Sequence, residues 1–288
     1  MFGIVSALGA ASSWTYACYL WRKQTRYFSA SQINITKNII AFVVFLPVIF
    51  TFEFQSNFKE ILILFASGII GISIGDTLYI ISLKKLGTRR TLAVEALSPI
   101  IATIIGSIFL KETLSIKVWL GVFVVSISLV GIVFQKTIKN QNITFKFEKK
   151  KGFVFALLSV LCAVAAATLS RFVLENSDLN PFQTTEIRLL GSIIGLIPFI
   201  RNNFINSVRN IPIKNKFGIL YATFFGTNIG ILLQQNVFKL LPIALGWTLL
   251  STSPVIALLF ARAEGEEIDF KTLLLTASTI VGICIVFL

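Results

Sequence analysis

Long apolar stretches alternate with short polar or charged breaks along the whole chain. A helix that crosses a membrane needs about 20 mostly apolar residues. Ten stretches of about this length lie between the breaks, at 2–21, 33–52, 60–83, 91–110, 117–135, 153–174, 181–200, 216–238, 243–262 and 270–288. Because these spans leave only short connections, the pattern predicts an all-α integral membrane protein with ten transmembrane helices.

The composition agrees with this prediction and excludes several functional classes. Of the 288 residues 55% are hydrophobic and only 14% are charged, and the mean hydropathy is +0.84. The chain has no His, which excludes His-containing metal sites and His-based nucleophile systems. The three cysteines lie far apart inside apolar runs, at Cys18, Cys162 and Cys284. We therefore expect no metal, no cofactor and no catalytic residue.

The net charge of +13 is better explained by membrane topology than by nucleic-acid binding. Loops after the odd-numbered spans, with the adjoining span ends, carry about 19 of the Lys and Arg residues, and those after the even-numbered spans carry about 5. The positive-inside rule then places the odd loops in the cytoplasm and both termini outside. The first span, which has no basic residue before it, is expected to be retained. We expect a multi-pass protein of the plasma (cell inner) membrane.

The second half of the chain repeats the first. An offset of 155 aligns residues 71–112 with residues 226–267 at 11 identities in 42 positions. Smaller offsets align the earlier spans, as with Arg22 and Arg171. This divides the chain into a first five-helix repeat at 1–135, a basic cytoplasmic linker at 136–151 and a second repeat at 152–288.

The odd number of helices in each repeat predicts that the two copies are inverted in the membrane. Basic loops follow the first and third helices of the first copy but the second and fourth helices of the second copy, as inversion requires. Substrates of inverted-repeat carriers bind near the middle of the membrane, where the repeats meet. The pattern thus favours a carrier over an enzyme.

The residues shared by the two halves resemble the EamA-type transporters of the drug/metabolite transporter superfamily. The resemblance covers essentially the whole chain and is carried by Lys37 and Arg188, Gly71 and Gly226, Gly75 and Gly230, Ser98-Pro99 and Ser253-Pro254, and Glu112 and Glu267. It implies a ten-helix carrier that moves amino acids, other small metabolites or drugs, often outward. Lys37 stands where Arg is more usual, and Glu264 also fits the position given to Glu267.

Ionisable groups inside the spans are functional candidates, because each costs about 2.5–3.5 kcal/mol to insert into a membrane. Lys37, Asp76 and Glu95 enter from the same side and form one cluster if their spans are neighbours. Three interpretations remain open: a zwitterion site with Lys37 on a carboxylate, a coupling proton on one of the acids, and a structural ion pair. The second repeat has Ile231 and Leu250 at the acid positions, so the cluster is asymmetric.

Other polar, aromatic and proline residues complete the candidate site. Arg188 either holds a substrate carboxylate or anchors its helix. Side chains that either line a cavity or serve helix packing are Trp14, Tyr79, Asn228, Gln234 and Trp247. Proline removes a backbone donor inside a span, so we expect helix kinks beside the pathway at Ser98, Pro99, Ser253 and Pro254. The paired glycines are expected to allow close helix packing.

These features predict a secondary transporter, with export as the expected direction, for an amino acid or a related amphipathic solute. It would work by alternating access, as a monomer or weak homodimer, with a proton as one candidate coupling ion. No phosphate-binding glycine loop is present for ATP to drive it. The alternative is a membrane-embedded enzyme or a flippase that acts on a lipid-linked substrate, for which Asp76 and Glu95 would be the paired acids.

Overall fold

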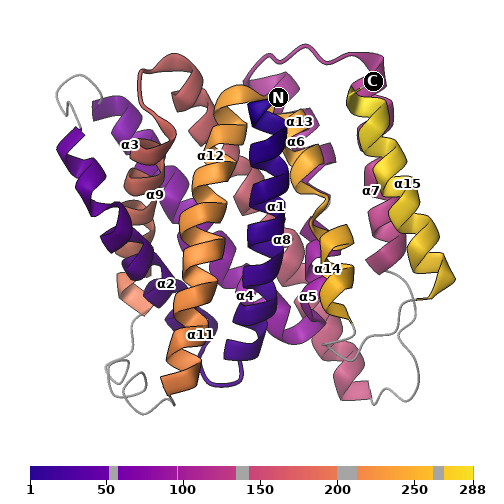
Figure 1. Cartoon of the computed structure of the whole chain (residues 1–288), viewed down its shortest axis with the longest axis horizontal. Coiled ribbons are helices and arrows are strands. Elements are labelled where there is room, and N and C mark those ends of the chain that lie inside the picture. The colour runs from indigo at the N-terminus through magenta and orange to yellow at the C-terminus, as the bar shows by residue number, and fades with distance from the viewer. Residues whose placement is uncertain (52–57, 96, 134–142, 200–212, 262–268, 288) are drawn as a thin grey trace.

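The computed structural model describes residues 1–51, 58–95, 97–133, 143–199, 213–261 and 269–287, and all regular structure in these ranges is helical (Figure 1). The N-terminal half contains α1 (Phe2–Gln24), α2 (Ala30–Phe45), the 3-10 segment η1 (Leu46–Thr51), α3 (Phe58–Ser67), the π-helical segment η2 (Gly68–Gly75), α4 (Asp76–Leu86), α5 (Thr88–Glu95), α6 (Ser98–Phe109) and α7 (Ile116–Val133). The C-terminal half contains α8 (Ile143–Asn176), α9 (Pro181–Leu196), the 3-10 segment η3 (Ile197–Phe199), α11 (Ile213–Thr223), the π-helical segment η4 (Phe224–Ile229), α12 (Gly230–Leu240), α13 (Ile243–Leu250), α14 (Ser253–Ala261) and α15 (Phe270–Phe287).

Six helical runs in the described residues are long and apolar enough to cross a membrane. They are Ala30–Thr51, Phe58–Leu86, Thr88–Phe109, Lys149–Asn176, Lys216–Leu240 and Ile243–Phe260. These runs coincide with six of the ten expected spans, and α1, α7, α9 and α15 overlie the other four. The surface of the bundle carries large exposed apolar side chains, including Phe50, Phe109 and Leu259. The chain is therefore an all-helical, multi-pass membrane protein.

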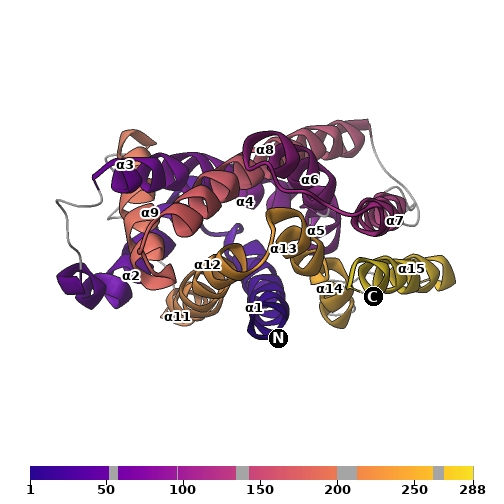
Figure 2. The same ribbon diagram turned by 90° about the horizontal axis from the view of Figure 1, so that it is seen from above.

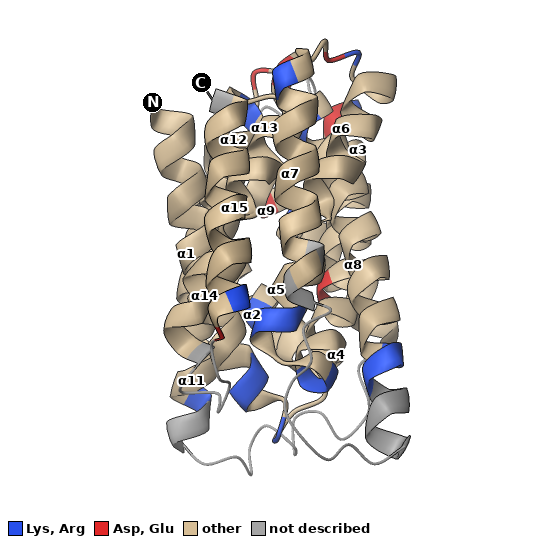
Figure 3. Cartoon of the chain, turned by 90° about the vertical axis from the view of Figure 1, so that its right-hand side faces the viewer, with Lys and Arg blue, Asp and Glu red and all other residues tan. Residues whose placement is uncertain are grey.

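Basic residues gather at one end of the bundle, as the loop pattern predicts. Figure 3 shows most of the Lys and Arg residues at the end where α1 turns into α2 and α4 turns into α5. The two ends of the chain lie at the opposite end of the bundle (Figures 1 and 3). The positive-inside rule assigns the basic end to the cytoplasm.

The main contacts between helices join the N-terminal half to the C-terminal half. Helix α1 packs along α12, η4 and α11, and α8 packs in the same way along α4, η2 and α3. Further contacts pair α2 with α9, α6 with α13, α5 with α14, and α7 with α15 (Figure 2). Because each half contributes equivalent elements to each contact, the centre of the bundle is built from both halves.

Two capping boxes start α2 and α9 in the same way. The Ser29 and Asn180 side chains each accept from the backbone N–H three residues ahead, and Gln32 and Gln183 bond back to the cap residues. Such a box satisfies two backbone donors that the helix itself leaves unpaired. Lys37 lies eight residues after the first cap and Arg188 eight residues after the second, so the two bases enter their helices to equal depth.

The glycines of η2 and η4 allow close helix contact at matching places. A Cβ atom at Gly71 would lie 2.6 Å from Cβ of Ala166 on α8, and one at Gly226 would lie 2.3 Å from Cβ of Ala17 on α1. An offset of 149, which also aligns Arg22 with Arg171, aligns Ala17 with Ala166. The close packing expected of Gly71 and Gly226 is therefore present, with equivalent partners in the two halves, whereas a Cβ atom at Gly230 would meet no other helix.

The two Ser-Pro pairs mark breaks between helices. Helix α5 ends at Glu95 and α6 begins at Ser98, whereas α13 ends at Leu250 and α14 begins at Ser253. Oγ of Ser98 donates to the carbonyl oxygen of Glu95 at 2.5 Å, and Oγ of Ser253 donates to that of Leu250 at 2.8 Å. The assigned helices thus change at both Ser-Pro pairs within longer helical runs, Thr88–Phe109 and Ile243–Phe260, and Glu95 and Leu250 end the helices that precede these pairs.

Candidate functional site

A small cavity lies between the two halves, near the broken helices. It is lined by Ala10, Ala11 and Trp14 of α1, Glu95 of α5, Gly230, Ile231 and Gln234 of α12, Trp247 and Leu250 of α13, and Ser253. Its volume is about 20 Å³, which is enough for about one water molecule. The fold therefore gathers five of the sequence-predicted residues, Trp14, Glu95, Gln234, Trp247 and Ser253, around one cavity.

Glu95 is the only charged residue in the cavity lining. Its Oε2 atom accepts from the hydroxyl of Tyr79 at 2.9 Å and from Nε1 of Trp14 at 3.2 Å. The hydroxyl oxygen of Tyr79 in turn accepts a hydrogen bond from the thiol of Cys18, with Sγ 3.4 Å away. Both donors to the carboxylate are neutral, and none of the ion pairs found among the described residues involves Glu95. An added cation in the cavity would be its counter-ion.

Aromatic and apolar groups form the other walls of the cavity. The Trp14 ring lies 5.4 Å from the Tyr79 ring, between centroids, and Trp247 is only 3% exposed. The indole N–H of Trp247 has no hydrogen-bond partner in the described structure, so it is an available donor. Ile231 and Leu250, which match Asp76 and Glu95 in the repeat, also line the cavity. Of the two matched pairs, only Glu95 and Leu250 both line the cavity, so the first half contributes an acid where the second contributes an apolar side chain.

Lys37 and Asp76 form an ion pair outside the cavity lining. Nζ of Lys37, a side chain that is 0% exposed, lies 2.7 Å from Oδ2 of Asp76. The same Nζ donates to Oδ1 of Asn38 at 2.9 Å. The structure thus brings together two members of the expected three-residue cluster, whereas Glu95 is held by Tyr79 and Trp14. Since Lys37 already has a carboxylate partner, it is not free to bind one on a substrate.

Two further candidates lie away from the cavity lining. Arg188 is buried on α9 beside Gly71, and its Nε and Nη1 atoms have no hydrogen-bond partner in the described structure. Asn228 donates from Nδ2 to the carbonyl oxygen of Ala41 at 3.3 Å, which joins η4 to α2. Asn228 thus makes one contact between helices, and its Oδ1 atom has no hydrogen-bond partner in the described structure.

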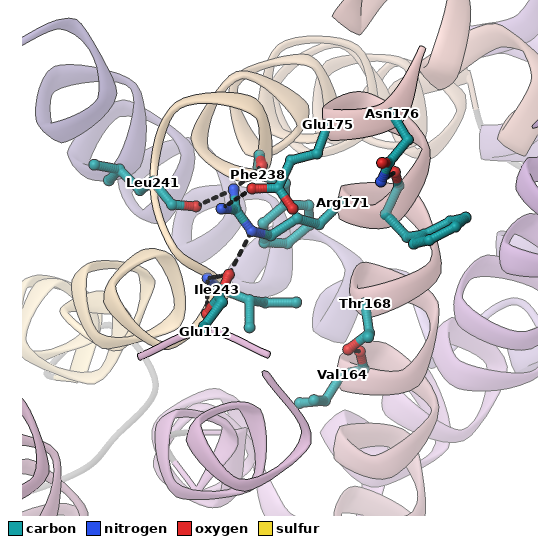
Figure 4. A network of polar contacts seen from close by, with 10 residues as sticks. Glu112, Val164, Thr168, Arg171, Glu175, Asn176, Phe238, Leu241 and Ile243 are labelled. Atoms are coloured by element: carbon teal, nitrogen blue, oxygen red, sulfur yellow. Dashed lines mark hydrogen bonds and ion pairs between the residues drawn. The ribbon is translucent and has the colours of Figure 1, made fainter. Parts of the chain in front are cut away.

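A polar network around Arg171 was not among the expected sites (Figure 4). Nε of Arg171 donates to Oε1 of Glu112 at 2.6 Å, and Nη1 donates to the carbonyl oxygens of Phe238 at 2.6 Å and Leu241 at 2.5 Å. Nη2 pairs with Glu175, and Glu112 accepts from the backbone N–H of Ile243 at 3.0 Å. The network ties α8 to the α6–α7 and α12–α13 connections.

Arg22, the residue that matches Arg171, lies beside Gly87 at the opposite end of the bundle. A Cβ atom at Gly87, where φ is +88°, would lie 3.1 Å from the guanidinium carbon of Arg22. The repeat aligns Arg22 with Arg171, and Gly87 with Pro242 in the α12–α13 connection. The match of Arg22 with Arg171 was the sequence signal for these two arginines. The partner expected for Glu112 in the repeat, Glu267 or Glu264, lies outside the described residues, as do residues 136–142 of the expected linker. The rest of that linker, 143–151, is helical and forms the start of α8.

Comparison with known proteins identifies the family. The model of the EamA-like transporter family matches residues 1–134 and 150–288. The chain belongs to the EamA-like transporter family. As an EamA protein it belongs to the drug/metabolite transporter superfamily, so its general function is transport.

Several relatives of this EamA protein were found. The uncharacterized transporter YyaM of Bacillus subtilis is 24% identical over 75% of this chain and 70% of its own length. Protein LicB of Haemophilus influenzae is 27% identical over 62% of this chain and 58% of its own length. A crystal structure of another protein matches with a TM-score of 0.70 at 13% identity, over 98% of this chain and 95% of the other, which shows similarity of fold.

Proposed function

We propose that this EamA protein is a secondary transporter for a small ammonium-bearing metabolite, either an amino acid or a related amine. It would move this solute by alternating access across the plasma membrane, outward if it follows the direction that the family resemblance favours. The observation that carries the substrate class is Glu95, an acid in the cavity lining whose hydrogen-bond partners there are all neutral.

The cavity walls suit a cation with an apolar body. A carboxylate attracts an ammonium group, and the faces of Trp rings attract cations by about 0.5–2 kcal/mol. Trp14 and Trp247 both line the cavity, and Ile231 and Leu250 offer an apolar surface. Neither Lys37 nor Arg188 is in the lining. The ammonium group is therefore the part of an amino acid or amine that this cavity would recognise.

Alternating access is supported by the equivalent contacts of the two halves. The Gly71–Ala166 contact matches the Gly226–Ala17 contact, and the helix breaks at Pro99 and Pro254 match as well. We infer ten transmembrane helices in two inverted five-helix repeats, 1–135 and 152–288. In such an arrangement the two halves exchange conformations, which opens one central cavity to each side in turn.

The cavity must enlarge for this function. A volume of about 20 Å³ does not admit an amine, so the structure corresponds to a contracted state. The Arg171 network joins the connections at the end of the bundle where the termini lie. Opening toward that side would require the bond between Arg171 and Glu112 to break.

The alternative is an enzyme or a flippase for a lipid-linked substrate. An enzyme of this kind would need Asp76 and Glu95 as a working pair. The two acids have separate partners, because Asp76 binds Lys37 while Glu95 accepts from Tyr79 and Trp14. This observation favours the carrier over the enzyme. A flippase would share the fold and differ in its substrate.

Uptake into liposomes that contain the purified full-length protein tests the proposal. The radiolabelled solutes should include amino acids paired with the amines formed by their decarboxylation, such as lysine with cadaverine, and an organic anion as the control. We expect saturable flux of ammonium-bearing solutes without any chemical product. Flux of the anion alone would contradict the substrate class, whereas turnover or flipping of a lipid-linked substrate would contradict the carrier.

A further inference from the structure

Glu186 is a buried acid in α9 that does not line the proposed substrate cavity. The capping box at Asn180 starts the helix, and Nε2 of Gln183 donates to the carbonyl oxygen of Thr51 at 2.9 Å. These contacts fix the first turn of α9 against the end of η1. At 1.5 Å per residue, Glu186 lies about 8 Å along the helix from Pro181. The side chain is therefore inside the bundle and not at its end.

The carboxyl group of Glu186 is buried without a hydrogen-bond donor. The residue is 2% exposed, and neither Oε1 nor Oε2 has a partner in the described structure. Three other acids with little exposure are all bonded: Asp76 to Lys37, Glu95 to Tyr79 and Trp14, and Glu112 to Arg171. Glu186 thus differs from these acids in having no group to stabilise a negative charge.

The side of α9 that carries Glu186 is apolar. Residues four apart share a helix face, and the Phe182 ring, one turn before Glu186, lies 6.3 Å from the Phe45 ring at the end of α2. Leu189 packs in a cluster with Ala41 and Phe45. Glu186 therefore lies on α9 between the residues that contact the end of α2 and the exposed side chains of Phe182 and Leu190.

Among the described residues, no charged side chain forms an ion pair with Glu186. The elements packed against α9 are α2, α3, α8, α12, η1, η2 and η3. Their charged or titratable residues with described side chains are Lys37, Lys59, Glu60, Lys149, Lys150, Lys151, Cys162, Arg171, Glu175 and Lys239, and α9 itself adds Arg188. None of them forms an ion pair with Glu186 among the described residues. Arg188, two residues further along α9, points to a different face of the helix.

We propose that Glu186 is the site at which this carrier binds a coupling proton. An ionised carboxylate without donors is very costly in an apolar environment, whereas the neutral acid is not. In the contracted state the carboxyl group holds a proton. When α2 and α9 separate and water enters, the acid transfers that proton to water and becomes a carboxylate. Binding reverses this transfer, so no other reactant is needed.

This inference rests on the proposed function, because a proton site couples transport only if the protein is a carrier. The two halves exchange conformations in the proposed cycle, and α2 and α9 are equivalent helices that contact each other across the halves. In the proposed cycle, their interface is one of those that rearrange. A proton held there would be exchanged with one side of the membrane in one state and with the other side in the next.

Infrared spectroscopy tests the proton site without knowledge of the substrate. The full-length protein in liposomes is measured between acidic and basic pH, and the band of protonated carboxyl groups is compared between the wild type and Glu186→Gln. We expect the variant to lose one such band and Asp178→Asn, an exposed acid near the start of α9, to retain it. Glu186→Asp should keep a band at a shifted position. An unchanged spectrum in Glu186→Gln would overturn the proposal.

Transport measurements then separate this inference from the proposed function. With an amine that the wild type transports, Glu186→Gln should still catalyse downhill flux, but an imposed pH gradient should no longer accelerate it. A pH-sensitive dye inside the liposomes should report no proton movement with the amine. Normal pH-driven flux in Glu186→Gln would contradict the proton site alone. Absence of all flux in the wild type would instead contradict the carrier.

Discussion

Nε of Arg171 donates to Oε1 of Glu112 at 2.6 Å and so joins the second half of the chain to the first. Both residues are largely buried, and Glu112 also accepts from the backbone N–H of Ile243. The bond closes the end of the bundle that the positive-inside rule assigns to the outside. In the proposed cycle this contact forms in the contracted state and breaks when the carrier opens outward.

Replacement of Glu112 by Gln should loosen this end of the bundle. The loss of a charge-assisted hydrogen bond costs about 1.5–3 kcal/mol, so local opening should become at least tenfold more frequent, as about 1.4 kcal/mol corresponds to a factor of ten. Hydrogen exchange of the segment around Ile243, followed by mass spectrometry, measures this opening. The Asp178→Asn variant is the control, and unchanged exchange in Glu112→Gln would show that the contact does not hold the connection.

Glu95→Gln should weaken the binding of ammonium-bearing solutes by at least tenfold. The variant keeps the shape and an acceptor for Tyr79 and Trp14, but it removes the negative charge from the cavity. The KM for the transported amine should therefore rise. Glu60→Gln, near the start of α3 and away from the cavity, is the matched control. An unaltered KM in Glu95→Gln would mean that the substrate does not bind beside this acid.

The Lys37–Asp76 pair should behave as a structural ion pair. Removing one partner of a buried pair leaves a charge without compensation and costs about 3–5 kcal/mol. Lys37→Met should therefore lower the stability of the protein in detergent sharply, and the double variant Lys37→Met/Asp76→Asn should recover most of the loss. A double-mutant cycle of unfolding measurements checks this. Additive effects of the two substitutions would contradict the structural interpretation.

Close helix contact at Gly68 predicts a steric effect of substitution. A Cβ atom there would lie 2.1 Å from the carbonyl oxygen of Arg188. A Cβ atom at Gly230 would meet only the carbonyl oxygen of Phe225, five residues earlier in the same helical run, at 3.3 Å. Gly68→Ala should force η2 and α9 apart and lower thermal stability, and Gly230→Ala should have little effect. Equal melting temperatures for the two variants would contradict the packing described for α9.

The sequence predicted the positions of the helices and the equivalent residues of the two halves. Apolar stretches and proline positions are local properties, so they located the spans and the helix ends beside Pro99 and Pro254. Helix α8, expected at 153–174, begins ten residues earlier, at Ile143, inside the expected linker. The pairing of Lys37 with Asp76 was also predictable, because both lie at similar depth on neighbouring spans. Glu95 was placed in the same cluster, but it ends α5 at a helix break, and the broken backbone directs it toward Trp14 and Tyr79.

The contacts between distant spans could not be read from the sequence. The α1–α12 and α8–α4 contacts depend on how the two halves fit together, which no local pattern determines. The network of Arg171 and Glu112 was present in the sequence as repeated residue pairs. Its partners include the carbonyl oxygens of Phe238 and Leu241, and every residue has such a group. For this reason the binding partners of the arginine could not be predicted from its position in the sequence.

Access to Gln234 from the two sides of the membrane tests the central claim most directly. In a protein whose native cysteines at Cys18, Cys162 and Cys284 are replaced by Ser, Gln234→Cys places one thiol in the cavity lining. A membrane-impermeant thiol reagent should label this cysteine when added to either side, and a transported amine should slow the labelling from both. Labelling from one side only, or from neither, would contradict alternating access.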